Sequence, residues 1–116
     1  MSRVRLRLGL AALAAGLIVG QSAALAASAD KGKAAFVKNG CWQCHGFVGQ
    51  GGVAGPKLAP DPIPAEAFVA FVRTTNRGMP PYSEAILSNE DLADIHAYLA
   101  SIPKVDPKSI PLLNTP

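Results

Sequence analysis

Two cysteines and a histidine lie within one five-residue segment, Cys41-Trp42-Gln43-Cys44-His45. In a helical turn, side chains three positions apart share a face, so each thiol can add to a vinyl group of one porphyrin. His45 follows directly and can offer an imidazole nitrogen to iron under the ring plane. The spacing C-x-x-C-H is the attachment pattern of c-type haem. It predicts one covalently attached haem c, with Cys41 and Cys44 as anchors and His45 as an iron ligand.

Two other kinds of site use a C-x-x-C pair. A thioredoxin-type dithiol is expected beside a βαβ pattern, and this sequence shows no convincing strand alternation. A zinc site needs a fourth ligand, usually from a second Cys or His pair, but beyond His45 the chain has only His96. The motif therefore favours haem over either alternative.

The sixth iron ligand can be predicted by elimination. Once the N-terminal leader is set aside, Met79 is the only methionine, and it lies in a Gly-Met-Pro-Pro loop where a core side chain is not expected. The rival is His96, which lies about 100° away from the centre of the apolar stripe of its helix and is expected to be solvated. We therefore predict Met79 as the second iron ligand.

Residues 1–29 have the features of a Sec-type signal peptide. Three arginines in the first seven residues precede an uncharged run from 8 to 29, whose strongly apolar part covers residues 8–20. That part fits the about 7–15 residues of a signal-peptide core and falls short of the roughly 20 that span a bilayer. Ala24-Leu25-Ala26 and Ala27-Ser28-Ala29 both match the A-x-A cleavage motif, which places the cut between about 26 and 29. An uncleaved leader would instead tether the domain to the membrane, and in both cases the domain is exported.

The predicted division of the chain is a leader at 1–29, a domain at 30–102 and a Pro-rich extended tail at 103–116. We expect no membrane span after cleavage. A domain this small has a thin margin of stability from hydrophobic burial alone. A bound cofactor is therefore expected to complete its core.

Helices are expected in three places around the motif. The first spans Asp30–Lys38, with Asp30 as its cap and Asn39-Gly40 as its stop, and the second runs from about Pro64 to Thr74. The second is predicted to carry Ala67, Phe68, Phe71 and Val72 on one apolar face. The third begins at the capping pair Ser88 and Asp91 and ends at Pro103. Its apolar stripe consists of Leu92, Ile95, Leu99 and Ile102. The glycines and prolines of segment 46–62 predict a long loop, so the expected fold is all-α.

On these residues, the chain resembles class I cytochromes c, over roughly residues 32–102. The haem motif is the specific part, and Gly55-Pro56 and Gly78-Met79-Pro80 support it. The resemblance implies the cytochrome c fold, with three to four short helices and long loops around one haem. It also implies that Gly32 and Phe36 of the first helix cross the last helix at Ile95–Leu99.

By the same resemblance, Pro56 would lie on the proximal side of the haem and accept the Nδ1 proton of His45 through its carbonyl. The short interval between His45 and Met79 is similar to compact bacterial cytochromes, including small subunits of periplasmic dehydrogenases. No tryptophan is available in the middle section to reach a haem propionate, and Arg73 or Arg77 could take that role. Trp42, at a variable position inside the motif, is expected near the edge of the haem.

Charge distribution bears on the partners of the protein. The chain has a formal net charge of +3, but residues 30–116 contain eight basic and eight acidic side chains. Within them, residues 30–81 carry +3 and residues 82–116 carry −3. A near-neutral domain with a basic leading half indicates a protein redox partner, and nucleic acid is not expected.

Three functions are compatible with these features. The first is a periplasmic monohaem electron carrier, without enzymatic activity, between a dehydrogenase or other respiratory donor and an oxidase or other cytochrome as acceptor. The second is a haem enzyme or gas sensor, which requires an open sixth position in place of Met79. The third is a C-x-x-C thiol oxidoreductase.

Overall fold

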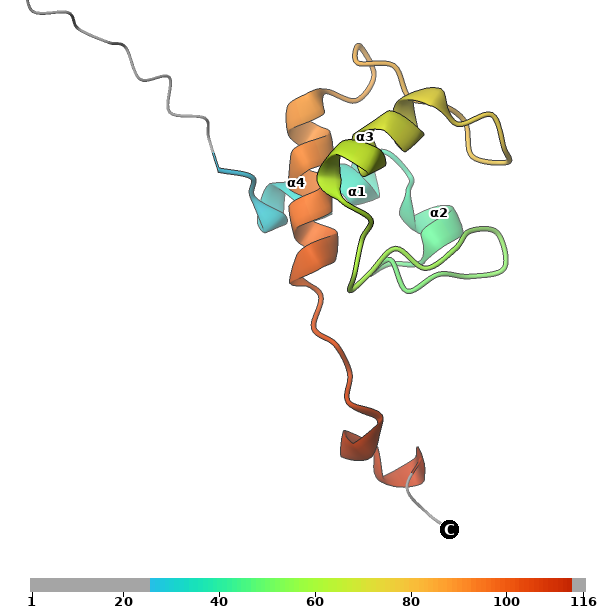
Figure 1. The fold of residues 1–116 in the computed structure, drawn as a ribbon, viewed down its shortest axis with the longest axis vertical. Helices are drawn as coiled ribbons and strands as arrows, with labels where there is room; N and C mark the ends of the chain where they lie inside the picture. The colour runs from blue at the N-terminus through green and yellow to red at the C-terminus, as the bar shows by residue number, and fades with distance from the viewer. Residues whose placement is uncertain (1–25, 114–116) are drawn as a thin grey trace, which may run out of the picture.

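The computed structural model describes residues 26–113, and the predicted leader up to residue 25 lies outside the described residues. Its regular structure is entirely helical, and residues 26–113 contain no strand (Figure 1). The elements are α1 (Ala29–Lys38), α2 (Trp42–His45), α3 (Ala65–Thr74), α4 (Asn89–Ser101) and the 3₁₀ turns η1 (Pro107–Ser109) and η2 (Pro111–Leu113). The predicted all-α fold is confirmed. No helix of residues 26–113 combines the length and apolar character needed to cross a bilayer.

Helix α1 begins one residue before the predicted start, because its cap is Ser28 and not Asp30. The Ser28 hydroxyl accepts a hydrogen bond from the Lys31 backbone N–H at 3.3 Å. Asp30 lies instead in the first turn, where its negative charge interacts favourably with the helix dipole. The helix ends at Lys38 with Asn39 as its C-cap, and Gly40 then adopts a φ of 74°, which glycine tolerates without strain.

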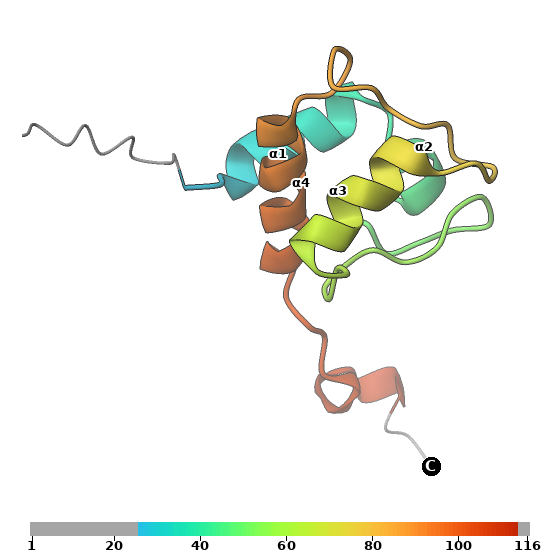
Figure 2. The same ribbon diagram turned by 45° about the horizontal axis from the view of Figure 1, so that its top comes forward.

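Helices α1 and α4 cross in direct contact, and both views show them side by side (Figures 1 and 2). Gly32 makes this approach possible, because a Cβ atom at this position would overlap the backbone carbonyl of Asp94. One turn later, the Phe36 ring packs against the Tyr98 ring with centroids 5.7 Å apart. The crossing that the resemblance implied is therefore present.

Behind the crossing lies a small hydrophobic core. Its fully buried large side chains are Phe36, Leu87, Leu92, Ile95 and Leu99. Each such side chain contributes about 1.5–3 kcal/mol relative to its exposure in water. Three of the four residues predicted as the apolar stripe of α4 thus lie in the core, and Ile102 is half-buried at the end of the helix.

Helices α3 and α4 begin close to the predicted residues. The Ser88 hydroxyl caps α4 by accepting from the Asp91 N–H at 3.0 Å. In α3, Phe68 and Val72 are buried, whereas Ala67 and Phe71 are exposed. The predicted apolar face of α3 is therefore only partly covered by protein.

The segment after α4 leaves the helical body, as Figure 1 shows. It was predicted to be extended, but η1 and η2 give it two short 3₁₀ turns. The Asp106 carboxylate caps η1 by accepting from the Lys108 N–H at 2.9 Å, and prolines occupy the first positions of both turns. Proline fixes φ near the helical value, so the residues expected to prevent regular structure instead begin these turns.

We predict that Gly32→Ala destabilises the protein by about 1–3 kcal/mol, because the added methyl group forces α1 away from α4. Urea unfolding followed by circular dichroism measures the effect. Gly78→Ala is the control, since a Cβ there meets no atom within 4 Å. Equal unfolding midpoints for the two variants would show that the crossing tolerates a side chain.

Candidate functional site

The C-x-x-C-H motif forms the short helix α2 and its cap. Cys41 is the N-cap residue in helical conformation, and its N–H donates to the Phe36 carbonyl at 3.1 Å, which ties the motif to the end of α1. The His45 N–H donates to the Cys41 carbonyl at 3.1 Å and closes the turn. Both thiols are free, with Cys41 half-buried and Cys44 exposed. The predicted helical turn therefore brings the two thiols and the imidazole into one local unit.

His45 is held in a defined orientation by the loop that follows it. Its side chain is buried, and Nδ1 lies 2.8 Å from the Pro56 carbonyl oxygen. Since a carbonyl can only accept, Nδ1 carries the proton and Nε2 keeps its lone pair. The hydrogen bond implied by the resemblance is present, and it leaves Nε2 available as a ligand.

Glycines let the loop backbone approach His45 closely. A Cβ atom at Gly55 would lie 2.9 Å from His45 Nδ1 and 2.9 Å from the Cys44 carbonyl oxygen. The Gly51 N–H donates to the His45 carbonyl at 2.8 Å, with Gly51 at a φ of 89°. A loop without regular structure thus packs against the imidazole because it lacks side chains at the contact.

These residues border a cavity of about 490 Å³. This volume is within the roughly 300–1,000 Å³ typical of small-molecule and cofactor sites. The predicted residues Cys41, Cys44, His45, Pro56 and Met79 all line it. Its walls include the side chains of Phe36, Leu58, Phe68, Phe71, Val72, Tyr82, Leu87, Leu92 and Ile95. Phe71 is exposed because its ring lines the cavity and is not packed in the protein core.

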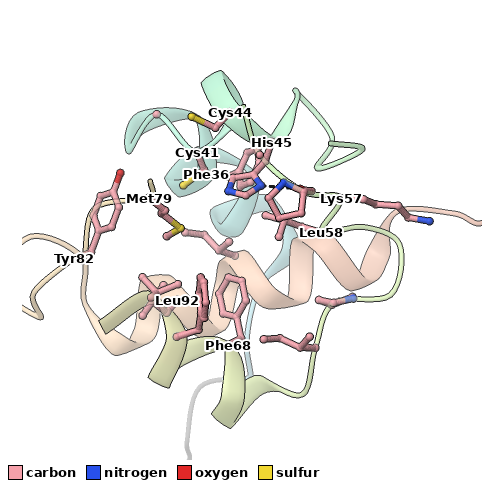
Figure 3. A pocket seen from close by; sticks show the side chains of 18 of the residues that line it. Phe36, Cys41, Cys44, His45, Lys57, Leu58, Phe68, Met79, Tyr82 and Leu92 are labelled. Carbon is pink, nitrogen blue, oxygen red and sulfur yellow. Dashed lines mark hydrogen bonds between the residues drawn. The ribbon is translucent and has the colours of Figure 1, made fainter. Parts of the chain in front are cut away.

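Met79 comes from the loop between α3 and α4, far from His45 in the sequence. Figure 3 shows its side chain and the His45 ring at the same cavity. Tyr82 anchors the following chain, since its N–H donates to the Val72 carbonyl at 3.0 Å and its hydroxyl to the Asn39 carbonyl at 3.2 Å. The imidazole of His45 from α2 and the thioether of Met79 from the loop after α3 therefore line one cavity.

The rival ligand His96 is not in the cavity lining. Its Nε2 lies 2.9 Å from the Ile63 carbonyl oxygen, and its ring packs edge-on against Phe68 at a centroid distance of 5.6 Å. These contacts of His96 hold the loop before α3 against α4. The His96 side chain is therefore less exposed to solvent than predicted. The geometry favours Met79.

The two arginines considered for a propionate have different positions. Arg73 donates to the Tyr82 carbonyl at 2.8 Å and to Asn89 Oδ1 at 2.7 Å, so its guanidinium is engaged in joining α3 to the segment before α4. Arg77 lines the cavity, as does Lys57 from the opposite loop. Of the two arginines, Arg77 is the one placed to meet an anionic group there.

Several residues that line the cavity were not predicted from the sequence. Tyr82, Leu58 and Lys57 line the cavity, but no motif marks them, and only their closeness to Met79 and Pro56 in the chain could have indicated them. Trp42 was expected near the edge of the haem. It is not in the cavity lining, and its ring stacks on exposed Phe47 with centroids 4.6 Å apart.

The properties of the thiols argue against a thiol oxidoreductase. Burial raises the pKa of the Cys41 thiol, and a backbone hydrogen bond offsets this effect only in part. Reactive dithiols need a lowered pKa, because the thiolate is the nucleophile. Within residues 26–113, no three His, Cys, Asp or Glu side chains are grouped in a way that could hold a metal ion.

A haem fits the chemistry of these walls. The lining of the cavity includes two free thiols, one imidazole whose Nε2 keeps its lone pair, and one thioether. Aromatic and aliphatic side chains form most of the remaining surface, which suits a large apolar macrocycle. Lys57 and Arg77 supply positive charge at the same cavity for its carboxylates.

Comparison with known proteins agrees with this geometry. Residues 27–99, more than half of the chain, match the family model described as cytochrome c oxidase, cbb3-type, subunit III, which is a c-type cytochrome domain. Comparison with curated proteins gave no significant match, and comparison with solved structures gave none either.

We predict that Gly55→Ala lowers the fraction of protein that carries covalent haem several-fold, because the methyl group displaces the His45 ring from Pro56. Haem absorbance per mole of purified protein gives this fraction. Gly52→Ala serves as the matched control in the same loop, since its Cβ would contact only the Cys44 carbonyl oxygen, at 3.4 Å. Full haem loading of Gly55→Ala would contradict the packing argument.

Proposed function

Since the chain belongs to the c-type cytochrome family described as cytochrome c oxidase, cbb3-type, subunit III, we propose that it is a periplasmic monohaem electron carrier in which His45 and Met79 ligate the iron. Domains of this family bind covalently attached haem c and transfer electrons. The observation that carries the proposal is the placement of both side chains at one apolar cavity beside Cys41 and Cys44. The proposed protein is a carrier or an electron-transfer subunit and not an enzyme.

Each proposed site residue has a separate task. Cys41 and Cys44 hold the porphyrin through thioether bonds formed at the vinyl groups, which fixes the ring relative to α2. His45 offers Nε2 to the iron, and the Pro56 carbonyl maintains the tautomer and the orientation of the imidazole ring. Met79 offers its thioether from the other loop.

The haem supplies an iron that exchanges one electron between its ferric and ferrous forms. A thioether ligand favours the ferrous form and so raises the reduction potential. With His45 and Met79 both bound, no position stays open for oxygen or peroxide. This arrangement supports electron transfer over the alternative of a haem enzyme or gas sensor.

The compartment and the partners are part of the proposal. The leader within 1–29 would direct export and be cut between about residues 26 and 29, and the exported chain would contain the domain at 30–102 and the tail at 103–116. Donors would be a periplasmic dehydrogenase or another respiratory protein, and acceptors an oxidase or another cytochrome. Such redox encounters are brief and guided by charge.

The test is a spectrum and an intact mass of the protein purified from the periplasm. We expect the mass of one covalently bound haem, a c-type reduced spectrum, the ferric Met–iron absorption and no rapid binding of carbon monoxide at neutral pH. Rapid carbon monoxide binding would favour the sensor or enzyme alternative. Two titratable thiols with no bound haem would favour the thiol oxidoreductase.

We predict that Met79→Ala abolishes the ferric Met–iron absorption and lowers the reduction potential. A decrease on the order of 0.1 V is expected, within the roughly 0.8 V over which axial ligands set haem potentials. Potentiometric titration measures it. His96→Gln is the control, because His96 contacts Ile63 and Phe68 outside the cavity. If only His96→Gln removed the absorption, the ligand assignment would be wrong.

Charge at the cavity gives a kinetic prediction. Arg77→Gln and Lys57→Gln each remove a cation from the cavity lining, and we expect each to slow electron exchange with an acidic partner about two- to tenfold at low salt. Stopped-flow rates at several ionic strengths measure this, since salt screens such attraction. Lys33→Gln is the charge-matched control, from exposed α1 surface outside the cavity lining. Equal slowing by all three variants would contradict local steering.

A further inference from the structure

Ser28, which the sequence places inside the predicted leader, is part of the folded domain. Its backbone N–H donates to Asp94 Oδ1 of α4 at 2.6 Å, across 66 positions of sequence. Its hydroxyl caps α1, and its carbonyl accepts from the Gly32 N–H at 2.9 Å. Ser28 therefore joins the start of α1 to α4 beside the Gly32 crossing.

Asp94 is a buried carboxylate, with only 4% of the residue exposed. Among residues 26–113, the Asp94 carboxylate accepts its hydrogen bond from the Ser28 N–H. A buried carboxylate without a partner is unfavourable, because it loses hydration and receives nothing in exchange. Loss of Ser28 would therefore remove this donor from the buried Asp94 carboxylate.

Cleavage at the two A-x-A motifs would affect the contact between Ser28 and Asp94 differently. Cleavage after Ala29 would remove the cap of α1 and the donor to Asp94 together. Cleavage after Ala26 would keep both. The backbone at residues 26–28 precedes the helix, and Ala26 and Ala27 are exposed.

The surroundings of this segment also suit a new amino terminus. Ala26, Ala27 and Ser28 line a shallow pocket together with Lys31, Glu90, Ala93 and Asp94. Successive Cα atoms are about 3.8 Å apart, so an amino group on Ala27 lies one residue from the Ser28–Asp94 contact. Lys31 already pairs with Glu90, with Nζ and Oε1 at 3.6 Å. The charged groups at this pocket are thus the carboxylates of Glu90 and Asp94 and the ammonium of Lys31. Their net negative charge can balance the ammonium of a new amino terminus.

We propose that the processed bond is Ala26–Ala27, so that the mature chain begins at Ala27 with its ammonium facing Asp94 and Glu90. A signal peptidase would hydrolyse this bond with one water molecule. The leader would leave with a carboxylate on Ala26, and the new amino group on Ala27 would take up a proton. The inference rests on the proposed export of the chain.

Amino-terminal sequencing and intact mass of the exported, haem-loaded protein test the assignment. A start at Ala27 supports it. A start at Ala29 or Asp30 overturns it while leaving export intact, and a start at Met1 overturns both this inference and removal of the leader. The same mass spectrum reports covalent haem, so failure of the carrier proposal would be seen separately.

A stability measurement tests the role of the new terminus. Asp94→Asn in the mature protein is expected to lower the urea midpoint more than Asp91→Asn, which makes the same charge change in the same helix at a residue that is not buried. A second variant, Ala26→Leu, disrupts the first motif and should move processing to the second. Its product, beginning at Asp30, should unfold at lower urea. Equal midpoints for the two products, or for the two aspartate variants, would overturn the proposal.

Discussion

The close approach of α1 and α4 at Gly32 is the constraint on which the rest of this structure depends. These helices come from the two ends of the domain, and their contact closes a chain whose middle is mostly loop. Only a residue without a Cβ fits against the Asp94 carbonyl, so the crossing has a fixed position along both helices. Phe36, Ile95 and Leu99 are buried as a consequence of that position.

The crossing also determines where the cavity lies. Phe36 from α1 and Ile95 and Leu92 from α4 face the same cavity as His45, so the core and the haem site share side chains. A domain of this size has little hydrophobic core of its own, and a bound apolar macrocycle would add to it. Stability and cofactor binding are therefore expected to depend on each other in this protein.

The site itself is assembled from loops that the helices hold in place. The loop after α2 brings the Pro56 carbonyl to His45, and glycines allow its backbone to pass close to the ring. The loop after α3 brings Met79, and hydrogen bonds of Tyr82 to α3 and to the end of α1 support it. The loop after α2 is also held by its own backbone, since the Gly52 N–H donates to the Gly55 carbonyl and the Leu58 and Ala59 N–H groups donate to the Gly49 carbonyl.

Much of this was predictable from the sequence, because the relevant interactions are local. The C-x-x-C-H spacing, the Ser88 cap and the apolar stripe of α4 depend on residues within one or two helical turns, and periodicity reveals them. The cap of α1 was misplaced because Ser28 and Asp30 are both good capping residues, and the contact that favours Ser28 comes from Asp94. The tail was expected to be extended, and the two short turns within it could not be predicted because proline both limits helices and begins 3₁₀ turns.

By itself, the sequence determined the all-α class, the haem motif and the candidate ligands, since these follow from residue type and short-range spacing. The sequence favoured Met79 over His96, but only the tertiary structure placed Met79 at the cavity and decided that Arg77, and not Arg73, lines it. Those choices depend on contacts between segments far apart in the chain. The physical reason is that His96 pairs with the Ile63 carbonyl and Arg73 donates to the Tyr82 carbonyl. A local sequence pattern does not reveal these partners.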